Sequence, residues 1–410
     1  MRLLTDIRPL RESADFRRLW IGSTVSQLGQ QMTAVTVSIQ VYALSHSTFA
    51  VGLVGLCSLV PLIVFGLYGG AMADAIDRRT LALFSSAGLW LLSMVLVLQS
   101  HLDWGQVWVL YAVVACQSAC FAVNNPARSA IIPRLIRPVL LPAANTLSQA
   151  AFNLGFTAGP LLGAAVIASQ GFAAAYLIDV ITFTAALYAL FRLPAVPPEG
   201  SVRRAGLRSV LEGFTFLRAA PALLATFLAD ILAMVFAQPR ALFPAVAGAF
   251  FGGGVRTVGL LQAAPAIGAL IGVLFSGWVT RVRRQGIAIV LAITAYAAAV
   301  GLFGLARTIW LGVALLAMSG AADMVSSAYR NTVLQSAAPD AMRGRLQGVF
   351  IVVVAGGPRL GDFVAGTTAS LTSPTIALLG GAAVCITGLM ILLVRNRPFR
   401  VYDSRTRALS

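Results

Sequence analysis

Twelve long apolar runs constrain the fold of this chain more than any other feature of its sequence. Each run approaches the roughly 20 residues that a helix needs to cross the hydrocarbon core of a bilayer. Backbone polar groups in that core must be paired within the protein, so runs of this length predict helices. We therefore expect an all-α integral membrane protein with twelve transmembrane helices. The predicted spans lie at 19–43, 50–72, 80–99, 105–127, 140–168, 172–193, 221–246, 256–279, 285–306, 309–331, 345–371 and 374–394.

The composition supports a membrane protein and argues against a soluble one. Hydrophobic residues make up 58% of the 410 residues, and charged residues only 11%. A soluble chain typically carries about 25% charged residues, so too little polar surface remains here to solvate a globule. The net charge of +16 could indicate a nucleic-acid partner, but the basic residues, all arginines, lie in short clusters between the apolar runs. We expect membrane lipid as a partner and no nucleic acid.

The arginines gather on one side of the predicted membrane. They occur in both terminal tails and in every second connection, whereas the alternate connections hold only Arg256 and Arg307. Cytoplasmic loops are enriched in basic residues. The pattern predicts a multi-pass protein of the inner (cytoplasmic) membrane of the cell, with both termini in the cytoplasm.

A polar stretch divides the chain into two sets of six predicted spans. We expect an N-terminal half at 1–193, a cytoplasmic linker at 194–220 and a C-terminal half at 221–410. Apolar residues at helical spacing over 207–219 predict an amphipathic helix on the inner membrane face. A loop packed against the bundle is the alternative for that segment.

The two halves share a motif. Gly-Pro-Leu-Leu-Gly at 159–163 is echoed by Gly-Pro-Arg-Leu-Gly at 357–361. Two related halves around a central site are the pattern of secondary transporters. Glycine permits close backbone approach and proline removes a backbone hydrogen bond, so these positions are predicted as hinges or as ordinary packing points. The set is Gly155, Gly159, Pro160, Gly163, Gly357, Pro358 and Gly361.

The connection after the second span resembles a known signature. It reads Gly-Gly-Ala-Met-Ala-Asp-Ala-Ile-Asp-Arg-Arg at 69–79 and resembles the signature loop of the major facilitator superfamily, in which glycine precedes an aspartate and a basic pair. The match is partial, because Ala75 stands where a basic residue is usual and Asp77 where glycine is usual. The stretch 155–164 resembles the glycine–proline motif of proton-coupled exporters in this superfamily.

Further stretches are similar to the bacterial enterobactin-exporter branch, and the resemblance covers essentially the whole chain. It implies two pseudo-symmetric six-helix halves and proton-coupled export of a small amphipathic molecule, such as an enterobactin-like catecholate siderophore or a drug. A multidrug efflux antiporter of broad specificity and a lipid flippase on the same fold are the alternatives. The stretches are 16–20, 26–29, 238–244, 320–335 and 357–362.

The resemblance also implies a gate at the inner surface. Asp74 of the signature loop is expected to help close the cytoplasmic side by facing a helix N-terminus, which attracts anions. Arg128 at the end of the fourth span is a plausible partner, and a solvated loop acid is the alternative. The gating candidates are Asp74, Arg78, Arg79, Arg128, Arg330, Arg359 and Asp362.

Acidic residues within the predicted spans are candidates for proton coupling. A charge at the bilayer centre costs about 2.5–3.5 kcal/mol on insertion scales. An acid paired with arginine that only holds the bundle together is the alternative for each. Asp362 follows Arg359 by three residues on one helical face, which predicts an ion pair. The four acids are Asp179, Asp230, Asp323 and Asp362.

Asp230 is expected to be the main proton carrier. It lies near the predicted midplane, and no basic residue stands within a turn or two along its span. Asp323 and Asp179 are further candidates. Asp323 and Arg330 are seven residues apart, which we take to be too far for direct pairing, and Asp179 has helix packing as an equal alternative.

The first span is unusually polar and predicts a face toward a water-filled cavity for the substrate, a small molecule. Hydrogen bonds between helices are the alternative. The cavity candidates are Ser26, Gln27, Gln30, Gln31, Gln117 and Asn153.

Nothing in the sequence indicates an enzyme. The two histidines, His46 and His101, lie on predicted outer connections, and no histidine–carboxylate metal set can be built. A phosphate-binding loop of the glycine–lysine type is absent because the chain has no lysine. We expect no metal and no cofactor, and a monomer whose partners are lipid, substrate and protons.

Overall fold

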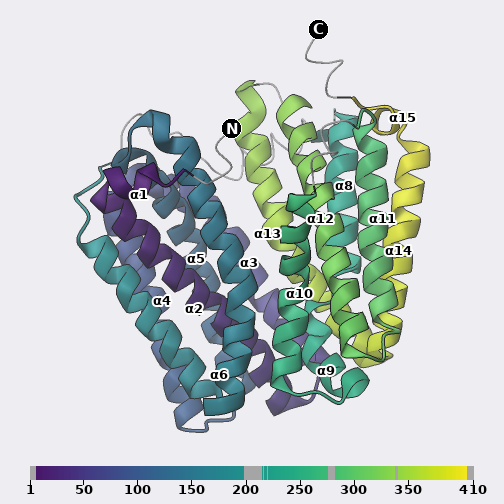
Figure 1. Cartoon of the computed structure of the whole chain (residues 1–410), viewed down its shortest axis with the longest axis horizontal. Helices are drawn as coiled ribbons and strands as arrows, with labels where there is room; N and C mark the ends of the chain where they lie inside the picture. Colours follow the sequence, from purple (N-terminus) through teal and green to yellow (C-terminus); the bar gives the residue numbers. More distant parts are fainter. Residues whose placement is uncertain are drawn as a thin grey trace. The chain divides into compact units, whose positions relative to one another are not determined.

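The computed structural model of this chain describes residues 6–197, 215, 217–218, 220–275, 282–337 and 340–403. At 67–71, 73–75, 335–337 and 340–352 it describes the backbone and not the side chains. Every regular element in these described parts is a helix (Figure 1). The predicted linker helix over 207–219 lies outside the described residues, apart from Thr215, Leu217 and Arg218.

Contacts divide the chain into two compact units. Unit 1 comprises Met1–Ser45 and Cys57–Gly206, and unit 2 comprises His46–Leu56 and Leu207–Ser410. Helix α3 (Thr48–Ala75) contributes its first part to unit 2 and the remainder to unit 1.

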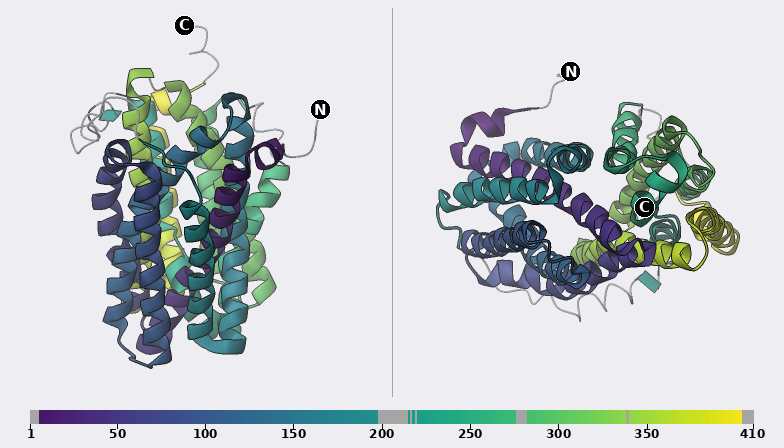
Figure 2. Two further views of the ribbon diagram at one scale, coloured as in Figure 1. Left: turned by 90° about the vertical axis from the view of Figure 1, so that its left-hand side faces the viewer. Right: turned by 90° about the horizontal axis from the view of Figure 1, so that it is seen from below.

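Unit 1 is a bundle of long helices that run side by side (Figure 2). Helix α2 packs along α6, and α4 packs against both α5 and α6. The remaining bounds are α1 (Arg8–Glu12), α2 (Ala14–Ser45), α4 (Arg78–His101), α5 (Val107–Leu135), η1 (Pro138–Leu140) and α6 (Leu141–Phe191).

Helix α6 contains two of the predicted spans. At Gly171 the backbone takes φ 82° and ψ −178°, which interrupts the helix. A positive φ is readily available to glycine and costly for other residues. The 51 residues of α6 therefore comprise two helical stretches that meet at the boundary between the predicted spans 140–168 and 172–193.

Unit 2 has a second set of packed helices. Helix α12 packs against α10 and α11, and α13 packs against α8. The bounds are α8 (Pro221–Phe236), η2 (Arg240–Leu242), α9 (Phe243–Phe251), α10 (Val255–Leu274), α11 (Gln285–Phe303), α12 (Ile309–Ala337), α13 (Asp340–Leu371), α14 (Pro374–Arg395) and α15 (Arg397–Arg400).

The predicted span 221–246 is not one continuous helix. Helix α8 ends at Phe236, and a short turn leads into η2 and α9. Pro239 stands in this turn, where a proline cannot supply the amide that a continuing helix would need. The break places Arg240 and Ala241 between two helical pieces.

Nine helices within the described residues are long and apolar enough to cross a bilayer. One of these nine, over Pro138–Phe191, contains the two stretches joined at Gly171. Helices α2 and α13 are long but do not meet the same measure of apolar composition. The all-helical membrane architecture is thus confirmed, whereas the count of twelve spans stays a prediction.

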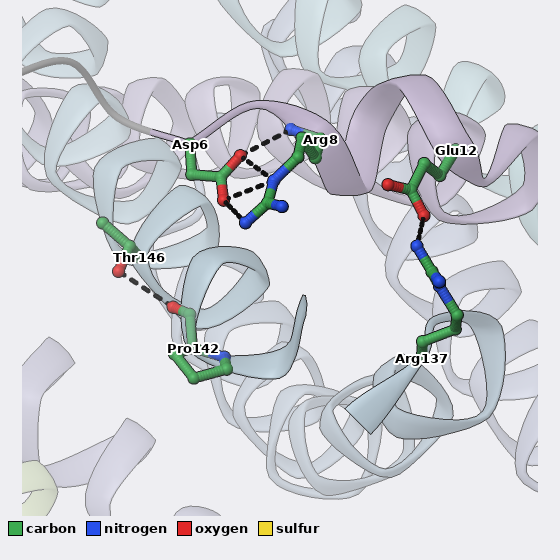
Figure 3. Close-up of polar contacts among 6 residues, drawn as sticks. All are labelled: Asp6, Arg8, Glu12, Arg137, Pro142 and Thr146. Atoms are coloured by element: carbon green, nitrogen blue, oxygen red, sulfur yellow. Dashed lines mark hydrogen bonds and ion pairs between the residues drawn. The ribbon is translucent and has the colours of Figure 1, made fainter. Parts of the chain in front are cut away.

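Exposed polar contacts tie the N-terminal segment to unit 1 (Figure 3). Glu12 of α1 pairs with Arg137, which precedes η1, and Asp6 pairs with Arg8. Thr146 donates a hydrogen bond to the carbonyl of Pro142 within the first turns of α6. Surface pairs of this kind contribute little to stability, so they orient the segment rather than hold the bundle.

Candidate functional site

The main candidate site in unit 2 is an arginine held between two acids. Arg330 on α12 forms an ion pair with Asp230 on α8, and its Nη2 donates a hydrogen bond to Asp323 Oδ1 at 3.2 Å. The side chains of Arg330 and Asp230 are only 7% and 4% exposed, whereas that of Asp323 is 40% exposed. The cluster therefore runs from a buried acid to one that is partly exposed.

This geometry corrects two expectations about the cluster. Asp230 was expected to lack a basic neighbour, but the packing of α12 beside α8 brings Arg330 to it from a distant part of the sequence. Asp323 and Arg330 were expected to be too far apart to pair, but the long arginine side chain reaches back over two turns.

The buried part of the cluster is incompletely hydrogen-bonded. Among the described residues, neither Asp230 Oδ2 nor Arg330 Nε has a hydrogen-bond partner. Burying charges is costly unless each is paired and its remaining hydrogen bonds are satisfied. An ion pair whose polar atoms lack some hydrogen bonds is easier to rearrange than one in which every polar atom is hydrogen-bonded. Such a pair is suited to changing partners.

Asp362 does not form the predicted ion pair with Arg359. Its Oδ1 accepts a hydrogen bond from the backbone amide of Ala241 at 3.2 Å, while Arg359 donates to the carbonyl of Ala355 one turn earlier on α13. The break between α8 and α9 exposes the amide of Ala241, which offers Asp362 a partner that the sequence spacing did not indicate.

Three acids of unit 2 each have at least one of three arginines nearby. The acids are Asp230, Asp323 and Asp362, and the arginines named with them are Arg240, Arg330 and Arg359. Arg240 is close enough to act electrostatically on both Asp323 and Asp362. One added proton would leave this set with an excess positive charge, so its arrangement should respond to protonation.

Asp179 on α6 is the buried acid of unit 1. It is 1% exposed, and its Oδ2 accepts hydrogen bonds from Thr33 on α2 at 2.9 Å and from Ser93 on α4 at 2.7 Å. Gln117 donates to the Ser93 hydroxyl at 3.4 Å, whereas Asp179 Oδ1 has no partner among the described residues. These contacts join α2, α4, α5 and α6 around one carboxyl group.

A second polar cluster near Asp179 was not predicted. The Tyr176 hydroxyl donates to Gln40 Oε1 at 2.7 Å, and Gln99 donates to the same oxygen at 3.0 Å. Gln40 and Gln99 also line an open recess of about 440 Å³, together with His101 and Gln170. The signal that could have indicated this cluster is a lone glutamine, Gln99, at the end of an otherwise apolar span.

Arg128 on α5 is held by hydroxyl groups. Its Nη1 donates to Ser23 at 3.1 Å and to Ser26 at 3.4 Å, and its Nη2 donates to Ser86 at 3.1 Å. Asn124, one turn earlier, donates to Ser86 at 2.7 Å. The predicted gating partner, Asp74, has a side chain outside the described residues, so that contact stays a prediction.

The basic pair of the signature loop binds the start of the segment after α6. Arg79 donates to the carbonyls of Leu190 and Phe191 at 3.2 and 2.6 Å. Arg78 donates to the carbonyl of Ala130 at 3.3 Å through its side chain and to that of Val196 at 3.1 Å through its backbone amide. These contacts lie within unit 1 and anchor the loop to the end of α6.

Asp77 completes this contact, a role that the sequence pattern did not indicate. One carboxylate oxygen accepts from the Thr80 amide at 2.8 Å and caps α4, and the other accepts from the Val196 amide at 2.7 Å. Burial by itself would raise the pKa of Asp77, but these hydrogen bonds and the charge of Arg79 outweigh it and lower the pKa below its ordinary value.

Two of the six predicted cavity residues, Gln27 and Gln31, contact α6. Gln27 and Gln31 on α2 lie against Gly155 and Gly159, and Gly163 lies against Met32. The other candidates occupy separate environments. Ser26 contacts Arg128, Gln117 contacts Ser93, Asn153 accepts a hydrogen bond from Gln149 at 3.3 Å, and Gln30 is partly buried on α2.

The glycine–proline motifs stand where helices pack closely. Gly357 and Gly361 on α13 lie against Met234 of α8, and a Cβ at Gly361 would be 2.0 Å from the Met234 carbonyl oxygen. Pro160 and Pro358 lie inside α6 and α13. These contacts describe packing positions, and motion about them stays a prediction.

Two bundles of membrane-spanning helices with acids and arginines in their interiors define a polytopic membrane transport protein. The chain belongs to the transmembrane secretion effector family of the major facilitator superfamily, whose sequence profile matches residues 4–408. The resemblance inferred from the motifs is thereby confirmed.

Individual relatives agree with this assignment. The enterobactin exporter EntS of Shigella boydii serotype 18 is 29% identical over 392 residues, which cover 95% of this chain and 94% of the relative. EntS of Escherichia coli O139:H28 has the same identity and coverage.

Solved structures of other transporters share the fold. The nucleoside transporter NupG has a TM-score of 0.71 at 14% identity and covers 93% of this chain and 99% of its own. A bacterial homologue of the human lysosomal transporter Spinster has a TM-score of 0.69 at 16% identity and covers 98% of both chains. At such identities the likeness concerns the fold alone.

Proposed function

We propose that this protein is a proton-driven exporter of a small amphipathic molecule. A catecholate siderophore of the enterobactin type is the favoured substrate, because the relatives that match nearly the whole chain are enterobactin exporters. A multidrug antiporter of broad specificity and a lipid flippase on the same fold are the alternatives.

The Asp230–Arg330–Asp323 cluster is the observation that carries proton coupling. Arg330 stays charged, so the strength with which α12 is tied to α8 depends on whether Asp230 is ionised. Protonation of Asp230 removes the charge attraction across these two helices and frees Arg330 to turn toward Asp323. The cluster thus converts a bound proton into a change of contact between two helices.

The two acids differ in exposure, and this difference gives them different roles in the proposed proton coupling. Asp323, at 40% exposure, can exchange a proton with water, whereas Asp230, at 4%, is the acid whose ion pair must break. Asp230 is therefore the coupling residue in this proposal, and Asp323 supports it. Asp179, buried in unit 1 without a cationic partner among the described residues, is a further proton-binding candidate.

Uphill efflux in proteoliposomes with an imposed pH gradient tests the coupling role. Asp230→Asn keeps the shape of the side chain but cannot cycle a proton, so gradient-driven efflux should fall roughly tenfold or more, within the usual range of coupling between sites. Asp323→Asn should have a milder effect. Substrate binding without a gradient should persist in both variants.

The matched control is Asp103→Asn, the same change on an exposed connection. Asp103 has a φ of 46°, a conformation that asparagine also tolerates. Undiminished uphill efflux by Asp230→Asn would remove Asp230 as the coupling residue. A strain lacking the protein, tested for both siderophore secretion and drug sensitivity, separates the siderophore exporter from the multidrug alternative.

A further inference from the structure

Arg128 is a partly buried cation whose contacts with the described side chains supply no compensating charge. Its three hydrogen bonds go to the hydroxyls of Ser23, Ser26 and Ser86, and no carboxylate is within ion-pair distance among the side chains that the structure describes. Its Nε has no partner there either. Arginine remains protonated in proteins, so this positive charge cannot be relieved by losing a proton.

Hydroxyl groups satisfy hydrogen bonds but leave the charge of the guanidinium uncompensated. A buried charge is costly unless it is paired. The guanidinium has five N–H donors, and the three hydrogen bonds to serines leave the buried Nε–H and one Nη–H without a partner among the described residues. A carboxylate can accept from two arginine donors at once.

In unit 2, by contrast, the positive charge of Arg330 is neutralised by a carboxylate. Arg330 on α12 contacts an acid, Asp230, on α8, which is the first long helix of unit 2. Arg128 on α5 contacts Ser23 and Ser26 on α2, the first long helix of unit 1. By helix order, the corresponding contact is thus made by serines in unit 1 and by a carboxylate in unit 2.

We propose that Arg128 binds a negatively charged carboxylate group of the exported molecule. The proposal rests on the proposed export function and adds that the substrate is negatively charged where it contacts Arg128. Arg128 and Ser23 are both partly exposed, while Ser26 and Ser86 are buried and hold the guanidinium in place.

The test compares binding of dihydroxybenzoate with binding of its methyl ester, which lacks the negative carboxylate. Calorimetric titration of the full-length protein in detergent, without a gradient, should give roughly tenfold tighter binding of the acid. Arg128→Gln should abolish this preference. Ser26→Asp should abolish it too, because the new carboxylate neutralises Arg128 from within the protein.

The serine variant separates a binding role from a structural one. Ser26→Asp keeps the arginine and supplies the missing charge, so it should unfold at the same temperature as the wild type or higher while losing the preference for the acid. Equal affinities of the wild type for acid and ester, or a retained preference in Ser26→Asp, would overturn the proposal.

Two further measurements identify the source of the anion. Inorganic phosphate at millimolar concentration should not compete with dihydroxybenzoate; competition would assign the site to an inorganic ion and overturn the substrate role. Asp74→Asn should leave the preference unchanged; a large gain in affinity would show that Asp74 neutralises Arg128. Asp230→Asn should bind normally, so failed coupling and failed anion binding are distinguishable.

Discussion

Asp77 shows how one side chain can take over a position at which the superfamily signature usually has glycine. Its two carboxylate oxygens accept hydrogen bonds from the amides of Thr80 and Val196. Val196 is itself buried in a cluster with Leu190 and Leu193 at the end of α6. The aspartate thus starts α4 and fastens the beginning of the segment after α6 to unit 1.

The lowered pKa of Asp77 predicts a pH-dependent contribution to stability. The carboxylate is favoured in the folded state, so its contribution is present above the ordinary value of 3.8 and is lost as the pH falls through the lower folded pKa. Asp77→Asn retains only one acceptor oxygen and should cost about 0.5–1.5 kcal/mol at neutral pH.

Unfolding temperatures in detergent, measured for the wild type and Asp77→Asn across a pH series, test this prediction. The wild type should be more stable at neutral pH, and the difference should shrink below about pH 4. A difference that is constant across the series would show that the charge of Asp77 does not contribute.

Helices α10 and α12 approach each other through two glycines. A Cβ at Gly320 would lie 1.8 Å from the carbonyl oxygen of Pro265, and one at Gly268 would lie 1.7 Å from that of Ala317. Small residues permit this close packing of membrane helices. Because α12 also carries Asp323 and Arg330, its position against α10 affects the geometry of the Asp230–Arg330–Asp323 cluster.

Gly320→Ala should separate α10 from α12 and destabilise unit 2 by about 1–3 kcal/mol, the usual cost of overpacking. The matched control is Gly380→Ala on α14, where an added Cβ meets nothing within 4 Å. Unfolding temperatures of the two variants provide the measurement, and an equal effect of both would contradict the role given to the close contact.

At the scale of the whole molecule, arginine placement predicts the orientation in the membrane. The arginines of alternate connections and of both tails should all face the cytoplasm. The connection between α4 and α5, which includes Asp103, carries no arginine and should face the opposite side.

Reporter fusions test this orientation. A reporter that is active only outside the cytoplasm should be silent after Ser410 and active when inserted after Asp103. The reverse pattern, or activity at both positions, would reject the predicted topology and with it the assignment of the inner surface to the signature loop.

The sequence by itself determined the membrane architecture, the helical class and the superfamily. Hydropathy and helix length are properties of contiguous residues, so the apolar runs and even the boundary at Gly171 could be predicted. The positions of Asp179, Asp230 and Asp323 within apolar helices were predictable for the same reason, but their exposure was not, because Asp179 and Asp230 are buried whereas Asp323 is 40% exposed.

The partners of those buried groups were decided only by the tertiary structure. Arg330 reaches Asp230 because α12 packs beside α8, and Asp179 meets Thr33 and Ser93 because three helices converge on it. Spacing along one helix gave the wrong partner for Asp362, which binds the amide of Ala241 instead. Such contacts depend on which helices become neighbours and how each is rotated, and local sequence periodicity contains neither.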